Sequence, residues 1–421
     1  MDDFNFEDIN SMEAALKALR LALERLPGPV RTTVEDSLDE LEALLSNRRS
    51  PRLAIIGRRG SGKSSLINAL CSRKVCEVGD VKATTGDTAW QTLEVPHGTL
   101  EILDTRGAQE GHKPSEETQD ALAIDSFVRA MGERNPDAVL FLCKASEVDS
   151  AIDGDIAFLA EVCKRIRFDS SVQMPVVGIV SQCDQLPQPH DLKPPYRERK
   201  TQLIEKAQSL LLEKRNSASE FAGVITVLPV SAYCEYDPKT KKTVNDGDFR
   251  WNIGVLSELL AEKLPKDAQL IFIRVCMIRA LQKKIATSIV VACSGLAAAF
   301  AATPLPFGDI GPLLGLQVLM VTAVAYVAGR EMDFETGKAL VKSLGAVGGA
   351  AWVAREVARG ILKFVPIAGN IVSAAVAGAT TYGLGVAAIA HLLEDASIDD
   401  ARARGEDAAK DKKTELELVA S

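Results

Sequence analysis

The stretch "GRRGSGKSS" at residues 57–65 places three glycines, three cations and three serines between two apolar segments. The segment before it, "RLAII" at 52–56, is typical of a buried β-strand, and "LINAL" at 66–70 is typical of a helix. The spacing matches G-x-x-x-x-G-K-[ST], a pattern that binds phosphate when it links a strand to a helix. The sequence therefore predicts a phosphate-binding loop, with a glycine-rich helix cap as the alternative.

Each residue type in this loop has a physical role. Gly57, Gly60 and Gly62 allow a tight turn that points backbone N–H groups inward, where they and the helix N-terminus attract phosphate oxygens. Lys63 is expected to reach the β- and γ-phosphates, and the Ser64 hydroxyl is expected to bind Mg²⁺. The candidate phosphate site is the whole loop, which comprises Gly57, Arg58, Arg59, Gly60, Ser61, Gly62, Lys63, Ser64 and Ser65.

Further apolar segments, with helical stretches between most of them, follow the loop. The candidate strands lie at 87–95, 100–104, 138–143, 176–181 and 224–231. This alternation predicts an α/β fold with a doubly wound, mostly parallel sheet. Ligands of such sheets bind at the carboxyl ends of the strands, which is where the glycine-rich loop is expected to lie.

Other strand ends carry residues suited to a guanine nucleotide. In "DTRG" at 104–107, Asp104 is expected to hold Mg²⁺ through water and the Gly107 N–H to contact the γ-phosphate. In "SQCD" at 181–184, the Asp184 carboxylate would accept hydrogen bonds from N1–H and the exocyclic amine of guanine, a pair of donors that adenine lacks. A backbone amide in "SAY" at 231–233 would meet the guanine oxygen. The remaining candidate base contacts are Gln182, Ser231 and Ala232.

The order of these motifs over residues 51–265 resembles the translation-factor-related GTPases, and among them the Era/TrmE-like group. The phosphate loop also resembles that of immunity-related GTPases. The resemblance implies Mg²⁺-dependent hydrolysis of GTP to GDP, and a first switch in "KATTGDT" at 82–88, where Thr85, or its neighbour Thr84, completes the Mg²⁺ shell. The implied catalytic residues are Lys63, Thr85 and Gly107, and the implied metal ligands are Ser64, Thr85 and Asp104.

The chain departs from this family's pattern in three places. Ser181 and Gln182 replace the Asn and Lys of N-K-x-D, so we expect the tie to the phosphate loop and the lysine stem over the purine to be lost, and guanine affinity to be weaker. Ala108 stands where Ras-like proteins carry a water-orienting Gln, which predicts slow intrinsic hydrolysis helped by a partner or a second protomer. Arg59 stands near the γ-phosphate, either as a charge stabiliser or, by the interpretation we favour, facing solvent.

The flanking regions predict an all-α domain built from N- and C-terminal helices. Residues 10–48 show two amphipathic helices. Residues 266–395 begin with a long helix and contain three runs without Asp, Glu, Lys or Arg, at 285–308, 310–329 and 364–393. These Ala- and Gly-rich runs either associate with a membrane or form the buried helices of a soluble bundle. They resemble the C-terminal region of YcjF-type proteins of unknown function. The predicted parts are thus 1–50, 51–265, 266–395 and a solvated, frayed tail at 396–421.

Composition limits the partners and the compartment. The 421 residues carry a net charge of −8 with a pI of about 5.3, which argues against a nucleic-acid partner held by general electrostatics. The eight cysteines form no C-x-x-C pair, and the acidic N-terminus is not a secretory signal, so we expect a cytoplasmic protein, possible also at the cytoplasmic membrane. The output is then a helical domain that touches membrane lipid or forms a homo-oligomer, or, alternatively, a soluble domain that binds a protein partner.

Overall fold

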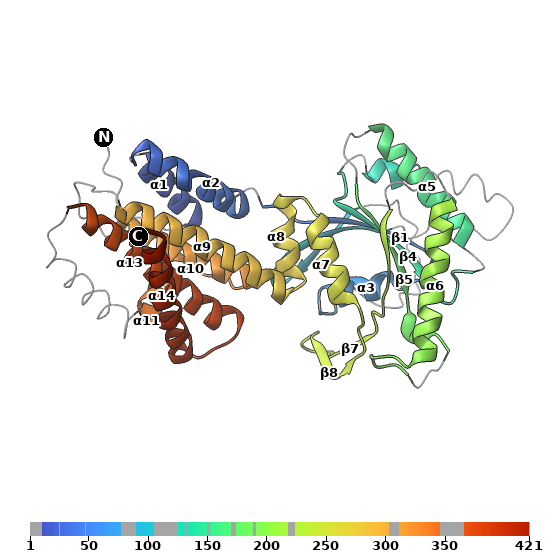
Figure 1. Ribbon diagram of the computed structural model, residues 1–421. Helices are drawn as coiled ribbons and strands as arrows, with labels where there is room; N and C mark the ends of the chain where they lie inside the picture. Colours follow the sequence, from blue (N-terminus) through green and yellow to red (C-terminus); the bar gives the residue numbers. More distant parts are fainter. Residues whose placement is uncertain are drawn as a thin grey trace. The chain divides into compact units, whose positions relative to one another are not determined.

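The computed structural model describes residues 11–24, 26–46, 48–76, 90–104, 125, 127–131, 134–149, 152–169, 174–187, 191–217, 224–302, 311–345 and 366–420. The chain divides into two compact units (Figure 1). The sheet unit comprises Arg49–Ile278, and the helical unit combines Met1–Arg48 with Arg279–Ser421.

The sheet unit is built on a six-stranded sheet with the order β2-β3-β1-β4-β5-β6. Strands β3, β1, β4, β5 and β6 pair in parallel, and β2 runs antiparallel to β3. The predicted α/β fold with a mostly parallel sheet is therefore confirmed, although the predicted strand at 87–95 is antiparallel in its described part. The strand bounds are β1 Arg52–Gly57, β2 Trp90–Val95, β3 Gly98–Asp104, β4 Ala138–Lys144, β5 Val176–Ser181 and β6 Val224–Pro229.

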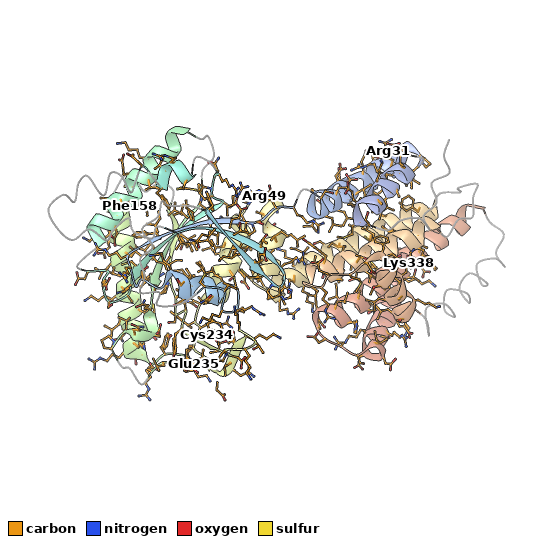
Figure 2. The ribbon with its side chains drawn as sticks, turned by 180° about the vertical axis from the view of Figure 1, so that it is seen from behind. Arg31, Arg49, Phe158, Cys234, Glu235 and Lys338 are labelled. Atoms are coloured by element: carbon orange, nitrogen blue, oxygen red, sulfur yellow. The ribbon has the colours of Figure 1, made fainter. Side chains whose placement is uncertain are left out.

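Helices cover both faces of this sheet, which is why its central strands are apolar on both sides (Figure 1). One layer holds α5 (Ile152–Asp169) and α6 (Glu198–Ser217), and the other holds α3 (Lys63–Leu70), α7 (Ile253–Lys263) and α8 (Lys266–Val275). Phe158 of α5 (Figure 2) packs in the first layer against Phe127, with ring centroids 6.4 Å apart. A small hairpin of β7 (Cys234–Tyr236) and β8 (Thr243–Asp248) follows β6.

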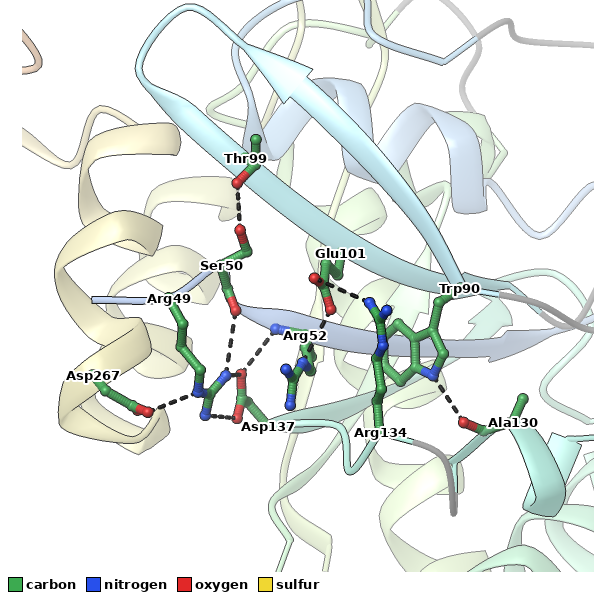
Figure 3. A network of polar contacts seen from close by, with 10 residues as sticks. All are labelled: Arg49, Ser50, Arg52, Trp90, Thr99, Glu101, Ala130, Arg134, Asp137 and Asp267. Carbon is green, nitrogen blue, oxygen red and sulfur yellow. Dashed lines mark hydrogen bonds and ion pairs between the residues drawn. The ribbon is translucent and has the colours of Figure 1, made fainter. Parts of the chain in front are cut away.

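A polar network lies at the amino-terminal edge of the sheet (Figure 3). Arg49 donates to both carboxylate oxygens of Asp137, at 2.7 and 2.8 Å, and to Asp267 at 2.7 Å. Asp137 also accepts the backbone N–H of Arg52 at 2.8 Å, and it is almost fully buried. The network thus joins the start of β1, the start of β4 and the first turn of α8. Because a buried carboxylate without its cation is strongly destabilising, Arg49 is a structural residue of this edge.

The helical unit contains helices from both ends of the chain. The two predicted amphipathic helices are confirmed as α1 and α2; Leu16, Leu19 and Leu23 of α1 are buried, and Arg20 bridges to Glu42 of α2. The helix bounds are α1 Met12–Glu24, α2 Gly28–Leu45, α9 Arg279–Ala302, α10 Gly311–Val327, α11 Phe334–Gly345, α13 Pro366–Leu393 and α14 Ile398–Ala420.

Glycine allows α13 and α14 to pack backbone against backbone. A Cβ on Gly383 would lie 2.5 Å from the carbonyl oxygen of Gly405, and a Cβ on Gly405 would lie 2.6 Å from that of Gly383. Ala401 and Ala409 of α14 are buried as well. The prediction of a frayed tail at 396–421 is therefore wrong, because the small residues of α14 form a face that packs along α13.

The predicted long helix that begins at Lys266 is also wrong. It is two helices, α8 and α9, and Met277 between them has a φ of +51°. The N–H groups of Met277 and Ile278 return to the carbonyls of Arg274 and Ile273, which closes the end of α8. Helical propensity continues through this segment, so the break is set by packing, since α8 stays with the sheet unit.

Among the residues that the structure describes, two helices of the helical unit are long and apolar enough to cross a membrane. They are α9 and the part of α13 at Ala374–Leu393; half of the apolar window of α9 and 72% of that of α13 are buried in the protein. The outward side of α9 carries Lys284, Thr287 and Ser288 together with Val291, and all four are exposed. Much of the apolar character of these helices is thus used for packing inside the helical unit.

Candidate functional site

The phosphate loop, residues 57–65, links β1 to α3 as predicted from the sequence. Gly60 and Gly62 have φ values of +75° and +92°, a left-handed conformation that suits glycine and directs successive N–H groups into the loop. Gly57 is needed for a different reason: a Cβ there would lie 2.7 Å from the carbonyl oxygen of Leu142 and 2.8 Å from Ser61 Oγ. The loop therefore turns without backbone strain at Gly60 and Gly62, and at Gly57 its backbone packs directly against β4.

Lys63 begins α3 and its side chain returns to the loop. Its Nζ donates to the carbonyl oxygens of Gly57 at 2.7 Å and Arg58 at 3.2 Å. The ammonium thus lies within the curve of the backbone, next to the N–H groups of the first helical turn. This local concentration of positive charge is suited to a polyphosphate.

The serines and arginines of the loop face different surroundings. Ser64 and Ser65 are half-buried in the first turn of α3, and the Ser61 hydroxyl is buried without a hydrogen-bond partner among the described residues. Arg58 donates from Nε to the buried carboxylate of Asp155 in α5 at 2.9 Å. Arg59 is exposed, in line with the interpretation favoured from the sequence.

The base loop, residues 181–184, is tied directly to the phosphate loop. Ser181 Oγ donates to the carbonyl oxygen of Ser61 at 2.7 Å, and Gln182 Nε2 donates to that of Gly60 at 2.6 Å. The expectation that Ser181 and Gln182 remove this tie is therefore wrong. A shorter hydroxyl and a neutral amide reach the carbonyls because β5 and β1 flank β4, and because Gln182 adopts a left-handed φ of +57°.

Asp184 lies in a short 3₁₀ turn, Cys183–Gln185, that follows β5. Its side chain is buried, and among the described residues none donates a hydrogen bond to its carboxylate. Burial raises the pKa of the neighbouring Cys183 thiol to about 12, which keeps that sulfur neutral at pH 7.

The segment at 231–233 meets the base loop from the end of β6. The Ser231 amide donates to the carbonyl of Trp251 at 3.1 Å, and the Ser231 hydroxyl accepts the N–H of Asp184 at 3.0 Å. Because the Ser231 amide is already used, the candidate amide for a base oxygen is that of Ala232. Ser231 acts instead by holding the backbone of Asp184.

Part of the predicted site lies outside the described residues. This applies to Thr84, Thr85 and Gly107. Asp104 is the last residue of β3, where its backbone pairs with Ile55 of β1, so the strand places it beside the phosphate loop. Asp104 and the Ser64 hydroxyl supply oxygen donors, which are the ligands that Mg²⁺ prefers. The residues present therefore fit this metal.

Sequence reasoning missed polar residues that shape the site. Asn68 lies inside the apolar helix α3. Its Oδ1 accepts the backbone N–H groups of Val75 and Cys76 at 2.8 and 2.7 Å, and its Nδ2 donates to the carbonyl oxygen of Cys76 at 2.8 Å. Lys144, at the end of β4, lies with its Nζ 3.6 Å from the Cβ position of Gly60 and pairs with Glu147. Lys200 of α6 is fully buried beneath the base loop. Isolated polar residues in apolar segments, such as Asn68, and a cation at a strand end, such as Lys144, were the available signals.

A glycine-rich loop between β1 and α3, an aspartate as the last residue of β3 and a buried carboxylate after β5 are features of a P-loop nucleotide-binding domain of the GTPase class. Residues 52–173 match a family described as "50S ribosome-binding GTPase", so this part of the chain is similar to the P-loop GTPases. The predicted resemblance to Era/TrmE-like GTPases is thereby confirmed.

The relatives are similar over part of their length only. The tRNA modification GTPase MnmE of Acidovorax sp. (strain JS42) is 32% identical over 143 residues, which is 34% of this chain and 28% of that protein. The GTPase Der of Leptospira borgpetersenii is 35% identical over 111 residues, which is 26% of this chain and 22% of that protein. Among solved structures, Toc33 of Arabidopsis thaliana with Mg²⁺ and GMPPNP is 16% identical, covering 61% of this chain and 95% of that chain, with a TM-score of 0.34. The chain thus spans about a quarter of these curated relatives.

Proposed function

We propose that the protein is a Mg²⁺-dependent GTPase that binds GTP and GDP at the carboxyl edge of its sheet. The strongest support is the pair of hydrogen bonds from the base loop to the phosphate loop, Ser181 to Ser61 and Gln182 to Gly60. They hold the carboxylate loop that is suited to guanine at a fixed distance from the loop that is suited to phosphate. One ligand with a purine at one end and a polyphosphate at the other can then occupy both.

In this proposal, each group acts on a defined part of the nucleotide. Lys63 and the N–H groups of the phosphate loop bind the β- and γ-phosphates, and Gly107 adds an N–H to the γ-phosphate. Ser64, Thr85 and Asp104 hold the metal. Mg²⁺ bound there would neutralise charge that develops on the phosphate oxygens during transfer.

Hydrolysis by the isolated protein is slow in this proposal, because Ala108 has no side chain that could orient the attacking water. A partner or a second copy of the chain then supplies the missing group. Turnover per molecule should therefore rise with protein concentration if the second copy is that partner. Fast turnover that is independent of concentration contradicts this part of the proposal.

The activity is tested by phosphate release from GTP and ATP, with and without EDTA. We expect release from GTP in Mg²⁺, little from ATP, and loss of release in EDTA. Ser64→Ala should require more Mg²⁺ for half-maximal turnover, while the control Ser209→Ala, exposed on α6, should match the natural protein. Equal release in EDTA would contradict the metal assignment.

The output of the switch is proposed to be the helical unit. The exposed Lys284, Thr287 and Ser288 of α9 and the buried apolar residues of α9, α10 and α13 favour a packed bundle that binds a protein partner or a second copy. Association with a membrane requires the apolar residues to leave this packing. Flotation with liposomes in GDP and in a GTP analogue separates the two, because lipid-bound protein in the analogue alone would support a membrane role and contradict the packed bundle as the output.

A further inference from the structure

A buried polar cluster lies beneath the base loop. Lys200 of α6 is fully buried, and its Nζ donates to the carbonyl oxygens of Asp184 at 2.5 Å and Asp191 at 2.7 Å. The ammonium also lies 4.9 Å from the ring centroid of Tyr196, a favourable cation–π distance. Burial lowers the pKa of Lys200 from its ordinary 10.5, while the charges of Asp191 and Asp184 oppose this effect.

The other backbone group of Asp184 is held from the end of the neighbouring strand, β6. Its N–H donates to Ser231 Oγ at 3.0 Å, and that oxygen shares a second hydrogen bond of 2.7 Å with the hydroxyl of Tyr196. Tyr196 packs edge-on against Trp251 at 5.3 Å, and Trp251 exchanges two backbone hydrogen bonds with Ser231. Side chains from outside the base loop thus hold both the N–H and the C=O of Asp184.

A buried lysine is costly, so its presence here needs a physical reason. An apolar side chain of similar length would fill the same space without desolvating a charge. What only a donor provides at this position is a bond to the Asp184 carbonyl. A fixed peptide fixes the position of Cα and Cβ from which the carboxylate extends, and two parallel hydrogen bonds to guanine require both carboxylate oxygens in one orientation.

We propose that Lys200 is a positioning residue for base recognition, which orients the Asp184 carboxylate through its own carbonyl so that it accepts both hydrogen bonds from guanine. Tyr196 supports the same orientation through the Ser231 hydroxyl. Lys200 lies under the loop and bonds to backbone, so it acts on specificity and not on the reacting phosphate. This inference rests on the proposed guanine site.

The test compares GDP with IDP, because inosine lacks the exocyclic amine of guanine and keeps N1–H. The variant Lys200→Met removes the donor and keeps the length of the side chain. We expect its preference for GDP over IDP, measured as the ratio of the two dissociation constants, to fall about tenfold, the size of one hydrogen bond to a charged group. The affinity for IDP should change little.

Two further variants keep the test decisive. Lys206→Met, exposed on the same helix, should leave both affinities unchanged. Tyr196→Phe keeps the ring and removes the hydroxyl, so the ratio should fall about threefold even if Lys200→Met does not fold, since one neutral hydrogen bond is lost.

The outcomes separate the two proposals. A natural protein that prefers GDP to IDP, with unchanged ratios in Lys200→Met and Tyr196→Phe, overturns the role of Lys200 alone. Equal weakening of GDP and IDP in the variants also overturns it, because that result describes a structural role. A natural protein without any preference for GDP over IDP and ADP overturns the guanine site, and the role of Lys200 with it.

Discussion

The phosphate loop and the base loop lie at the same edge of the sheet, but they are held in different ways. The turn of the phosphate loop is made by its own residues: Lys63 bonds to carbonyls five and six residues before it, and the loop turns on its own glycines. Ser181 and Gln182 add bonds to it from the base loop. The base loop is held by other segments, with the Asp184 backbone bonded to Ser231 from the end of β6 and to Lys200 from α6. A loop whose turn depends on its own residues can be recognised from a local motif. The base loop depends on contacts with distant residues, so its local sequence alone says less about how it is held.

The largest expected effect is that of Lys63→Ala, which acts on the phosphate loop. The variant removes the cation that the phosphate loop places within its own curve, so GTP and GDP affinity should fall about 100-fold or more, the size of two charge-assisted hydrogen bonds. Calorimetric titration measures it. Lys164→Ala, exposed on α5, is the matched control and should bind as the natural protein does.

A substitution in the base loop is expected to change which base the protein prefers. Asp184→Asn replaces one acceptor oxygen with a donor, so GDP affinity should fall about 30-fold, and xanthosine diphosphate, which offers an acceptor at that position, should gain. Competition between GDP and XDP against a fluorescent nucleotide measures the ratio. Unchanged GDP affinity in Asp184→Asn would contradict the guanine assignment, and Asp246→Asn, exposed on β8, controls for the loss of charge.

A substitution in the phosphate loop that leaves every charge in place should act through the backbone. Gly62→Ala forces a Cβ into a φ of +92° and should destabilise the sheet unit by about 1–2 kcal/mol. Thermal unfolding measures it. Gly154→Ala in α5 is the control, since a Cβ there meets nothing within 4 Å. If both variants melt at the same temperature, the loop is not constrained as described.

The smallest effect is expected where the two loops meet. Gln182→Ala removes one hydrogen bond to Gly60 and should weaken GDP binding about fivefold without changing the preference over ADP, since a neutral hydrogen bond contributes about 1 kcal/mol. Gln202→Ala, exposed on α6, is the control. A change in the GDP to ADP ratio would show that Gln182 contacts the base itself.

Much of the sheet unit could be predicted from the sequence because its signals are local. The continuous apolar strands and the motif at 57–65 fix the parallel sheet and the phosphate loop. The tie through Ser181 and Gln182 could not be predicted, since it depends on the distance between two strand ends. Lys200 was missed because a lysine in a polar helix gives no sign of burial.

The helical unit was harder to predict, because its signals are ambiguous. Charge-free, Ala-rich runs have the same composition in a membrane helix and in a buried helix. The contact between Gly383 and Gly405, which makes α14 a packed helix, depends on a neighbour 22 residues away, and no local pattern encodes it. The break at Met277 likewise follows from the packing of α8 in the sheet unit.

The central claim is that one nucleotide bridges the phosphate loop and the base loop, with guanine read by Asp184. Calorimetric titration of the purified protein with GTP, GDP, ATP and ADP in Mg²⁺ tests it most directly. The account predicts saturable one-to-one binding of GTP and GDP, and binding of ATP and ADP at least about tenfold weaker, since adenine lacks the pair of donors, N1–H and the neighbouring amine, that guanine offers to the carboxylate. Equal affinity for adenine and guanine nucleotides, or no heat of binding with GTP at millimolar concentration, would contradict it.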